Sequence, residues 1–303
     1  MRIFLNYLQQ VKALLVNGFS NYKQSRIRML QRIANRPDFL LPFRQKAPTI
    51  EQALSTIYAG RDRLLNPEGL WNILMFRGAT YGSLYAKCDL LWFDTCEEWT
   101  EYYTESKDTL DGEKTKYFVN ISAYGYNNTR RNIDNIPVYW KERKRWTSFI
   151  KTDPDVKETY KFLTQTQQTR DGQRKVFPNI GSLTALLICG DLIEMEILDM
   201  PAIEDWAELI HDVKKGATMG LQALVLLQEK FTKQEVVDAF TLLHTFLLEN
   251  LSEEDQELMG YNIVMLEHAL CKFTRVLTKA EKADSTHKKK PSKKRVGKKA
   301  KLS

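Results

Sequence analysis

The sequence has few cysteines, and their spacing builds no metal or redox motif. The four are Cys88, Cys96, Cys189 and Cys271, and no two show the CxxC spacing of zinc ribbons or redox motifs. His268 and Cys271 stand three apart in a helical stretch, but such a pair is usually incidental. We therefore expect no metal ion and no other cofactor.

Long apolar runs are also missing. No stretch approaches the ~18 apolar residues that span a bilayer, and Ile3–Leu15 is interrupted by Asn6, Gln9, Gln10 and Lys12. A signal peptide needs an unbroken apolar core and a small-residue cleavage site, which this segment lacks. We expect an intracellular protein with no membrane partner, located in the nucleus if eukaryotic and in the host cytoplasm if viral.

Positive charge is concentrated at the C-terminal end. The net charge is +7, yet residues 281–303 hold ten Lys and Arg against two acids, a net of +8. The preceding 280 residues are therefore nearly neutral, at −1. We expect 279–303 to be a disordered tail that binds phosphates or serves as a nuclear-import signal. The tail residues expected to contact DNA are Lys289, Lys290, Lys293, Lys294 and Arg295.

Most of the chain is patterned for helices. Apolar residues recur at helical spacing near the N-terminus and through residues 183–276, while three prolines break the chain before residue 49. Tyr117–Tyr126 is rich in β-branched and aromatic residues and is expected to be a strand or an irregular buried segment. We predict a mainly α fold, with N-terminal helices and a loop at 1–48 and a helical domain at 49–278.

The strongest functional signal lies at Phe177–Asp191. Residues 176–185 read VFPNIGSLTA, which resembles the helix–hairpin–helix signature L-P-G-I-G-x-x-T-A. In that motif two helices flank a tight hairpin, and its backbone N–H groups bind a DNA phosphate together with the second helix N-terminus. Asn179 replaces the usual first glycine and tolerates positive φ, while Gly181 keeps the approach open.

The hairpin at 177–185 is therefore our predicted DNA contact. The residues expected to take part are Asn179, Ile180, Gly181, Ser182 and Thr184. The alternative is a Pro-Asn turn between two core helices, because both residues are common in turns. Tyr124 and Tyr126, close to Arg130 and Arg131, could stack on a nucleotide or belong to the core.

The same motif occurs in DNA glycosylases, which carry a catalytic Asp further along the chain. Asp199 falls near that distance, although it is equally explained as an acid just before Pro201 at a helix start. Bifunctional glycosylases place a Lys after the hairpin, where this chain has Ser182 and Leu183. Lyase chemistry is therefore not expected, and the four-cysteine iron–sulfur loop of some glycosylases is also missing.

A second resemblance is longer. The stretch Phe177–Leu221 resembles the glycosylase-like helical proteins of thymidine hypermodification, namely the α-glutamyl/putrescinyl-thymine pyrophosphorylases, the amino acid:DNA transferases and the helical domain of 5-hydroxymethyluracil DNA kinases. It rests on the hairpin, on Asp191-Leu192 and on residues 216–221, which read GATMGL. Phe76-Arg77 matches part of the aromatic–Arg pair of this family. The family loop Gly-Pro-Gly is replaced by residues 214–216, which read KKG.

The resemblance implies a transferase acting on a thymine-derived base in DNA. A phosphorylated 5-hydroxymethyl group would leave and an amine, from a small amine or amino-acid donor, would take its place. Asp191 could accept a proton from the amine, unless it is only a buried acid with a partner. The groups that could stabilise the departing phosphate are Arg77, Lys214, Lys215 and the backbone amides of Gly216 and Ala217.

Other functions stay open. The lysine pair at 214–215 is also explained as a solvated pair. A base-excision glycosylase using Asp199, or a non-catalytic DNA-binding protein of the same fold, would share the hairpin. A kinase is not expected, because the sequence has no GxxxxGK[ST] loop.

Overall fold

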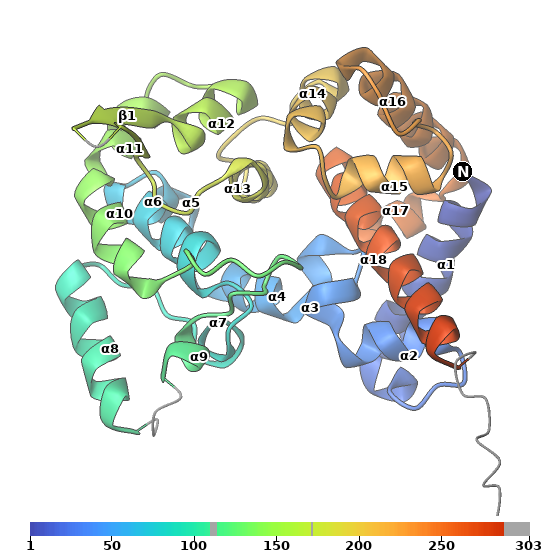
Figure 1. Ribbon diagram of the computed structural model, residues 1–303, viewed down its shortest axis with the longest axis horizontal. Helices are drawn as coiled ribbons and strands as arrows, with labels where there is room; N and C mark the ends of the chain where they lie inside the picture. The colour runs from blue at the N-terminus through green and yellow to red at the C-terminus, as the bar shows by residue number, and fades with distance from the viewer. Residues whose placement is uncertain (110–113, 171, 288–303) are drawn as a thin grey trace, which may run out of the picture.

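The computed structural model describes residues 1–109, 114–170 and 172–287, and it is mainly helical (Figure 1), which confirms the predicted class. The elements up to residue 109 are α1 (Arg2–Asn17), η1 (Phe19–Tyr22), α2 (Arg28–Asn35), α3 (Pro37–Leu40), η2 (Arg44–Lys46), α4 (Pro48–Ser55), α5 (Arg61–Leu64), α6 (Pro67–Leu74), the π-helix η3 (Met75–Thr80), α7 (Leu84–Cys88) and α8 (Cys96–Thr109).

The middle of the chain contains shorter helices and a small sheet. Its elements are α9 (Lys114–Phe118), η4 (Ile133–Asn135), α10 (Ile136–Glu142), α11 (Lys144–Ile150), α12 (Val156–Thr164), β1 (Thr166–Thr169), β2 (Gly172–Lys175) and α13 (Ser182–Glu194). Tyr117–Tyr126 contains the end of α9 followed by turns, so the irregular alternative is the correct one there.

The C-terminal part is all helical. Its elements are α14 (Ile203–Val213), α15 (Ala217–Ala223), α16 (Lys233–Asn250), α17 (Glu253–Met259) and α18 (Ile263–His287). Gly260, with φ at 63°, ends α17 in the left-handed conformation that glycine adopts without strain. No helix in the described part of the chain is both long and apolar enough to cross a membrane.

Helix α1 lies beside the last helices of the described chain. The ring of Phe4 in α1 packs edge-on against Phe273 in α18, with 5.3 Å between centroids, and Lys12 forms an ion pair with Asp255. In Figure 1 the helices α1 and α14–α18 lie to the right of α13, whereas α8 and α10–α12 lie to its left. Residues 1–48 therefore pack with the C-terminal helices.

Helix α13 lies at the centre because its sequence is apolar on every side. All residues from Thr184 to Ile193 are buried, as expected for a helix without a polar face. Asp191 is the charged exception, and a buried carboxylate needs partners. The surroundings of α13 therefore decide what the candidate site can do.

The element before the hairpin differs from the prediction. The antiparallel strands β1 and β2 pair from Thr166↔Lys175 to Thr169↔Gly172, so a strand, not a helix, leads into the turn before α13. The nearest preceding helix, α12, still packs against α13. The predicted helix–hairpin–helix connection is therefore wrong in its first half, because a ten-residue β-hairpin segment is inserted there.

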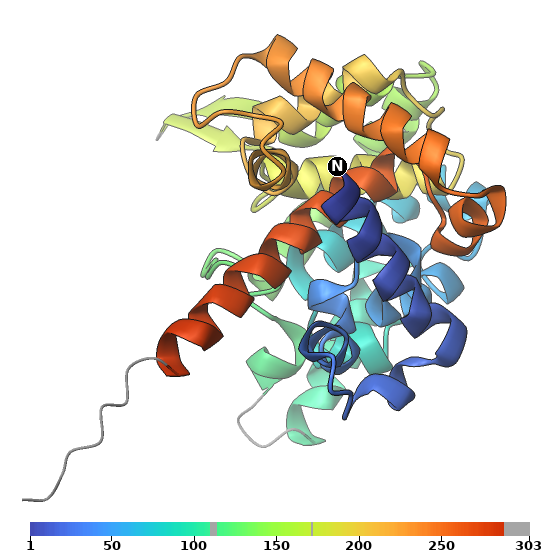
Figure 2. The same cartoon turned by 90° about the vertical axis from the view of Figure 1, so that its right-hand side faces the viewer.

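The C-terminal boundary also needs correction. Helix α18 continues to His287, beyond the predicted tail start at residue 279, and its last turns extend away from the body in Figure 2. The predicted tail contacts lie outside the described residues; they are Lys289, Lys290, Lys293, Lys294 and Arg295.

Candidate nucleic-acid interface

The turn before α13 is fixed by side-chain hydrogen bonds. The backbone N–H of Ile180 donates to the Phe177 carbonyl at 3.2 Å. Asn179 has φ at 65°, the positive value that the third position of a type II turn requires. Its Nδ2 donates to the Gly78 carbonyl at 2.7 Å, and its Oδ1 accepts from Asn128 Nδ2 at 2.6 Å. The prediction that Asn179 adopts positive φ is confirmed.

The π-helix η3 presses directly on this turn. A Cβ atom at Gly78 would lie 2.6 Å from Tyr139 Oη and 2.9 Å from Ile180 Cδ1, so only glycine fits there. Tyr139 Oη in turn donates to the Pro178 carbonyl at 2.6 Å. The backbone leading into α13 is therefore held rigidly in position.

The first turn of α13 offers free backbone N–H groups. The first helical hydrogen bond runs from Ala185 N to Gly181 O at 2.9 Å, and no side chain caps the helix. The amides of Ser182, Leu183 and Thr184 precede that bond. A Cβ atom at Gly181 would meet nothing within 4 Å, so the approach to these amides is open.

A cavity of about 550 Å³, the α13 pocket, lies at this helix end. Three cations line it: Lys175 from β2, Arg130 from the loop after α9, and Lys215 after α14. Lys175 Nζ donates to the Ile180 carbonyl at 2.7 Å, and partial burial lowers its pKa from the ordinary value. Cations and a helix N-terminus together favour an anion such as phosphate.

A second cavity, the aromatic cleft, of about 350 Å³, continues from the first, and the two share Tyr126, Leu183 and Lys215. Its walls include Tyr124 and Tyr126 with Phe39 and Met219, and Lys215 Nζ lies 5.8 Å from the Tyr126 ring centroid. Flat apolar walls of this kind suit a planar ring.

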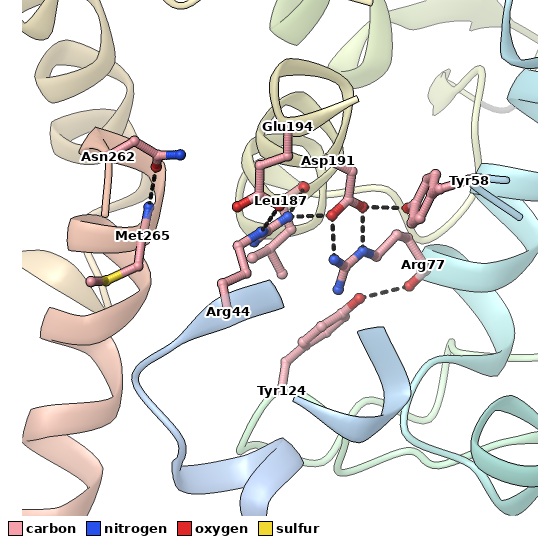
Figure 3. A network of polar contacts seen from close by, with 9 residues as sticks. All are labelled: Arg44, Tyr58, Arg77, Tyr124, Leu187, Asp191, Glu194, Asn262 and Met265. Atoms are coloured by element: carbon pink, nitrogen blue, oxygen red, sulfur yellow. Dashed lines mark hydrogen bonds and ion pairs between the residues drawn. The ribbon is translucent and has the colours of Figure 1, made fainter. Parts of the chain in front are cut away.

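Asp191 lies at the centre of a buried ion-pair network (Figure 3). Its carboxylate accepts hydrogen bonds from Arg77, with Nε to Oδ2 at 2.5 Å, from Arg44, and from Tyr58 Oη at 2.5 Å. Burial alone would raise the pKa of Asp191, but Arg77 and Arg44 outweigh it and hold that pKa below its ordinary value. Arg44 also pairs with Glu194 at 2.9 Å.

This network changes the roles expected of Asp191 and Arg77. Asp191 is 2% exposed and lines neither the α13 pocket nor the aromatic cleft, so it has no access to an incoming amine. Asp191 therefore fits the alternative that the sequence left open, a buried acid with partners. Arg77 reaches the inner wall of a further cavity, but its guanidinium is committed to Asp191. Asp191 and Arg77 therefore hold each other in position, and Asp191 also holds Arg44 and Tyr58.

The remaining predicted residues are only partly brought together. Lys215 and Gly216 line the aromatic cleft, whereas Lys214 ends α14 in the left-handed conformation, with an exposed side chain, and Ala217 is buried at the start of α15. Asp199 is exposed in the link between α13 and α14 and lines neither the α13 pocket nor the aromatic cleft.

Sequence reasoning missed several residues of the site. Lys175 follows a polar stretch with no motif of its own. On α18, His268 and Cys271 were considered only as a metal pair, and the described residues contain no group of three or more potential ligands.

Comparison with protein-family models, with curated proteins and with solved structures finds no match to this chain.

Proposed function

We propose that the protein binds DNA through the start of α13 and modifies a base held in the aromatic cleft. The observation that carries this proposal is the continuity of the α13 pocket with the cleft through Tyr126, Leu183 and Lys215. The pocket suits a phosphate and the cleft suits a ring, the two parts of one nucleotide.

The phosphate step rests on the open α13 terminus. Backbone amides and a helix dipole bind phosphate without reading sequence, and Arg130 and Lys175 add charge at the rim. Since the body of the chain is nearly neutral, this local cluster matters more than overall charge.

The base step rests on the size and chemistry of the cleft. Enzymes that act on a base in DNA move it out of the stack into a pocket with aromatic or apolar walls. The cleft between Tyr124, Tyr126 and Met219 provides such walls, and its lining contains no Asp or Glu.

The chemistry follows the resemblance to the thymidine-hypermodification proteins. An amine nitrogen forms a bond to the 5-methylene carbon while the bond from that carbon to the phosphate oxygen breaks. The oxygen leaves with the phosphate, and the proton lost by the amine goes to a base. Glu267 is the one acidic side chain in the cavity continuing inward from the cleft, and burial raises its pKa to about 7, which suits proton transfer near neutral pH.

The test is mass spectrometry of nucleosides after the protein acts on DNA containing phosphorylated 5-hydroxymethyluracil, with an amine or amino acid supplied. The expected product is a nucleoside heavier than thymidine by the amine substituent, together with free phosphate. Release of a free base would instead indicate a glycosylase, and unchanged DNA with retained binding would indicate a non-catalytic protein. Either result overturns the proposed reaction.

A matched pair of variants tests the DNA contact. Arg130→Met removes a rim cation, and Arg174→Met removes an exposed arginine that does not line the α13 pocket. We expect Arg130→Met to weaken binding of every DNA sequence and to reduce the salt slope by about 1, while Arg174→Met changes neither. Equal effects of the two would contradict the assignment of the pocket.

A further inference from the structure

The aromatic cleft continues inward into a smaller cavity, the α18 chamber, through Tyr124, Leu183, Cys271 and Arg275, which line both. The chamber has a volume of about 30 Å³, close to that of one water molecule. Only the end of a ligand can enter it, while the rest of that ligand lies in the cleft. The ionisable groups that line it are Arg44, Arg77, Glu267, His268, Lys272 and Arg275.

Two of these cations lack a counter-ion. Lys272 is 4% exposed and donates to the Asp38 carbonyl at 2.8 Å, and Arg275 donates to the Tyr124 carbonyl at 3.1 Å. Within residues 1–109, 114–170 and 172–287, neither side chain pairs with a carboxylate. Arg44 and Arg77, by contrast, already pair with carboxylates, Arg77 with Asp191 and Arg44 with both Asp191 and Glu194. A buried charge without a partner is costly.

His268 adds an unsatisfied polar atom. It is 9% exposed and lines the chamber, and its Nε2 has no hydrogen-bond partner. Burial and the nearby cations lower its pKa far below the ordinary value, so the ring is neutral. A neutral imidazole can donate one hydrogen bond to an acceptor, and a buried polar atom of this kind is destabilising unless a ligand satisfies it.

We propose that a phosphate-class oxyanion binds where the aromatic cleft opens into the α18 chamber, with its oxygens directed into the chamber and with His268, Lys272 and Arg275 as its direct contacts. The proposal rests on the proposed function and deepens it: the substrate is a base that carries an anionic group, and that group points at α18. Of the phosphate site expected from the sequence at Lys214 and Lys215, only Lys215 lines the cleft, where the cleft meets the α13 pocket.

The charges around Lys272 predict how binding depends on pH. Burial lowers the pKa of Lys272 to about 7, and burial raises that of Glu267 to about 7. The charged or titratable groups facing these two are Asp38 in α3, Arg44 in η2, and Cys271 and Arg275 in α18. An anion favours protonated Lys272, so binding takes up a proton at Lys272 and weakens as pH rises.

The test uses inorganic sulfate, which keeps its double charge across this pH range. Isothermal titration is done on the full chain carrying Gly181→Asp, which blocks the α13 pocket, so the chamber is measured separately from the DNA contact. The same chain with Lys272→Met or with Arg275→Gln provides the comparison, and Arg174→Met is the control. All four share the C-terminal lysines, so differences between them report on the chamber.

We expect sulfate affinity to fall at least roughly tenfold in both α18 variants and to be unchanged in the control. Between about pH 6 and about pH 8.5 a group with a pKa of about 7 loses most of its proton, so affinity should fall roughly thirtyfold. Sulfate binding that survives Lys272→Met and Arg275→Gln, or that does not change with pH, overturns the proposal. The DNA contact is tested separately, by measuring DNA binding of the Lys272→Met chain with native Gly181. Unchanged sulfate binding together with intact DNA binding would contradict the chamber assignment alone.

Discussion

Replacing Gly181 by Asp should strengthen the fold and weaken DNA binding at the same time. Gly181 is the N-cap residue of α13, with φ at −99° and ψ at −177°, a conformation open to any residue. A side chain there meets nothing within 4 Å. Asp or Asn can therefore cap the amides of Leu183 and Thr184 without strain, and these are the amides that we assign to a DNA phosphate.

The two effects have different sizes. Asp or Asn in place of an N-cap Gly stabilises a helix by a few tenths of a kcal/mol, and the carboxylate adds about 0.3–1 kcal/mol through the helix dipole. Losing a charge-assisted contact to phosphate costs about 1.5–3 kcal/mol, or roughly tenfold to a hundredfold in affinity. Asp should be worse than Asn for DNA because it also repels the phosphate.

The assay pairs urea unfolding with fluorescence anisotropy on a short DNA, in the full chain and in a chain ending at His287. The Gly181→Asn variant can cap the same amides without adding a charge. Comparing it with Gly181→Asp therefore separates the effect of capping from the effect of the carboxylate charge. A folded Gly181→Asp chain that binds DNA as tightly as the native chain, in the absence of the tail, would refute the reasoning.

Three further predictions follow from the charges and the tail. Asp191→Asn should destabilise the protein by about 3–5 kcal/mol in urea unfolding, because it leaves Arg77 buried without a carboxylate and Arg44 with Glu194 alone; a stable but inactive variant would instead make Asp191 a proton acceptor. Stability should be lowest near pH 7. The folded pKa of Glu267 is raised from 4.5, so stability falls as pH rises from 4.5 to about 7, and that of Lys272 is lowered from 10.5, so stability rises from about 7 to 10.5. Glu267→Gln should remove the first change and Lys272→Met the second, as measured by unfolding across this range; a flat profile would contradict both shifts. Removing residues 288–303 should lower the salt slope of DNA binding but keep the difference between native and Gly181→Asp chains; loss of all binding would place the interface in the tail.

The sequence predicted the turn before α13 better than the segment that leads into this turn. Positive φ at Asn179 and an open Gly181 follow from residue types and spacing, and both are observed. The strands β1 and β2 were missed because residues 166–175 are almost entirely polar, so no alternation of apolar and polar residues marks them. Periodicity detects a strand only when one of its faces is buried.

The partners of Asp191 could not be predicted for another reason. Arg44 and Arg77 lie 147 and 114 residues away in the sequence, and charge alone does not say which cation faces which acid. The same holds for α18, where Lys272 and Arg275 look like a polar helix face until α3 and the Tyr124 loop cover them. These contacts arise from tertiary packing, which local patterns do not encode.

The most direct test of the central claim is photo-crosslinking to DNA in which 5-iodouracil replaces one thymine, followed by mass spectrometry of the peptides. The central claim predicts adducts on Tyr124 or Tyr126 in the aromatic cleft, and their loss in the Gly181→Asp chain. Adducts confined to other surfaces, or adducts in the cleft that Gly181→Asp leaves unchanged, would contradict it.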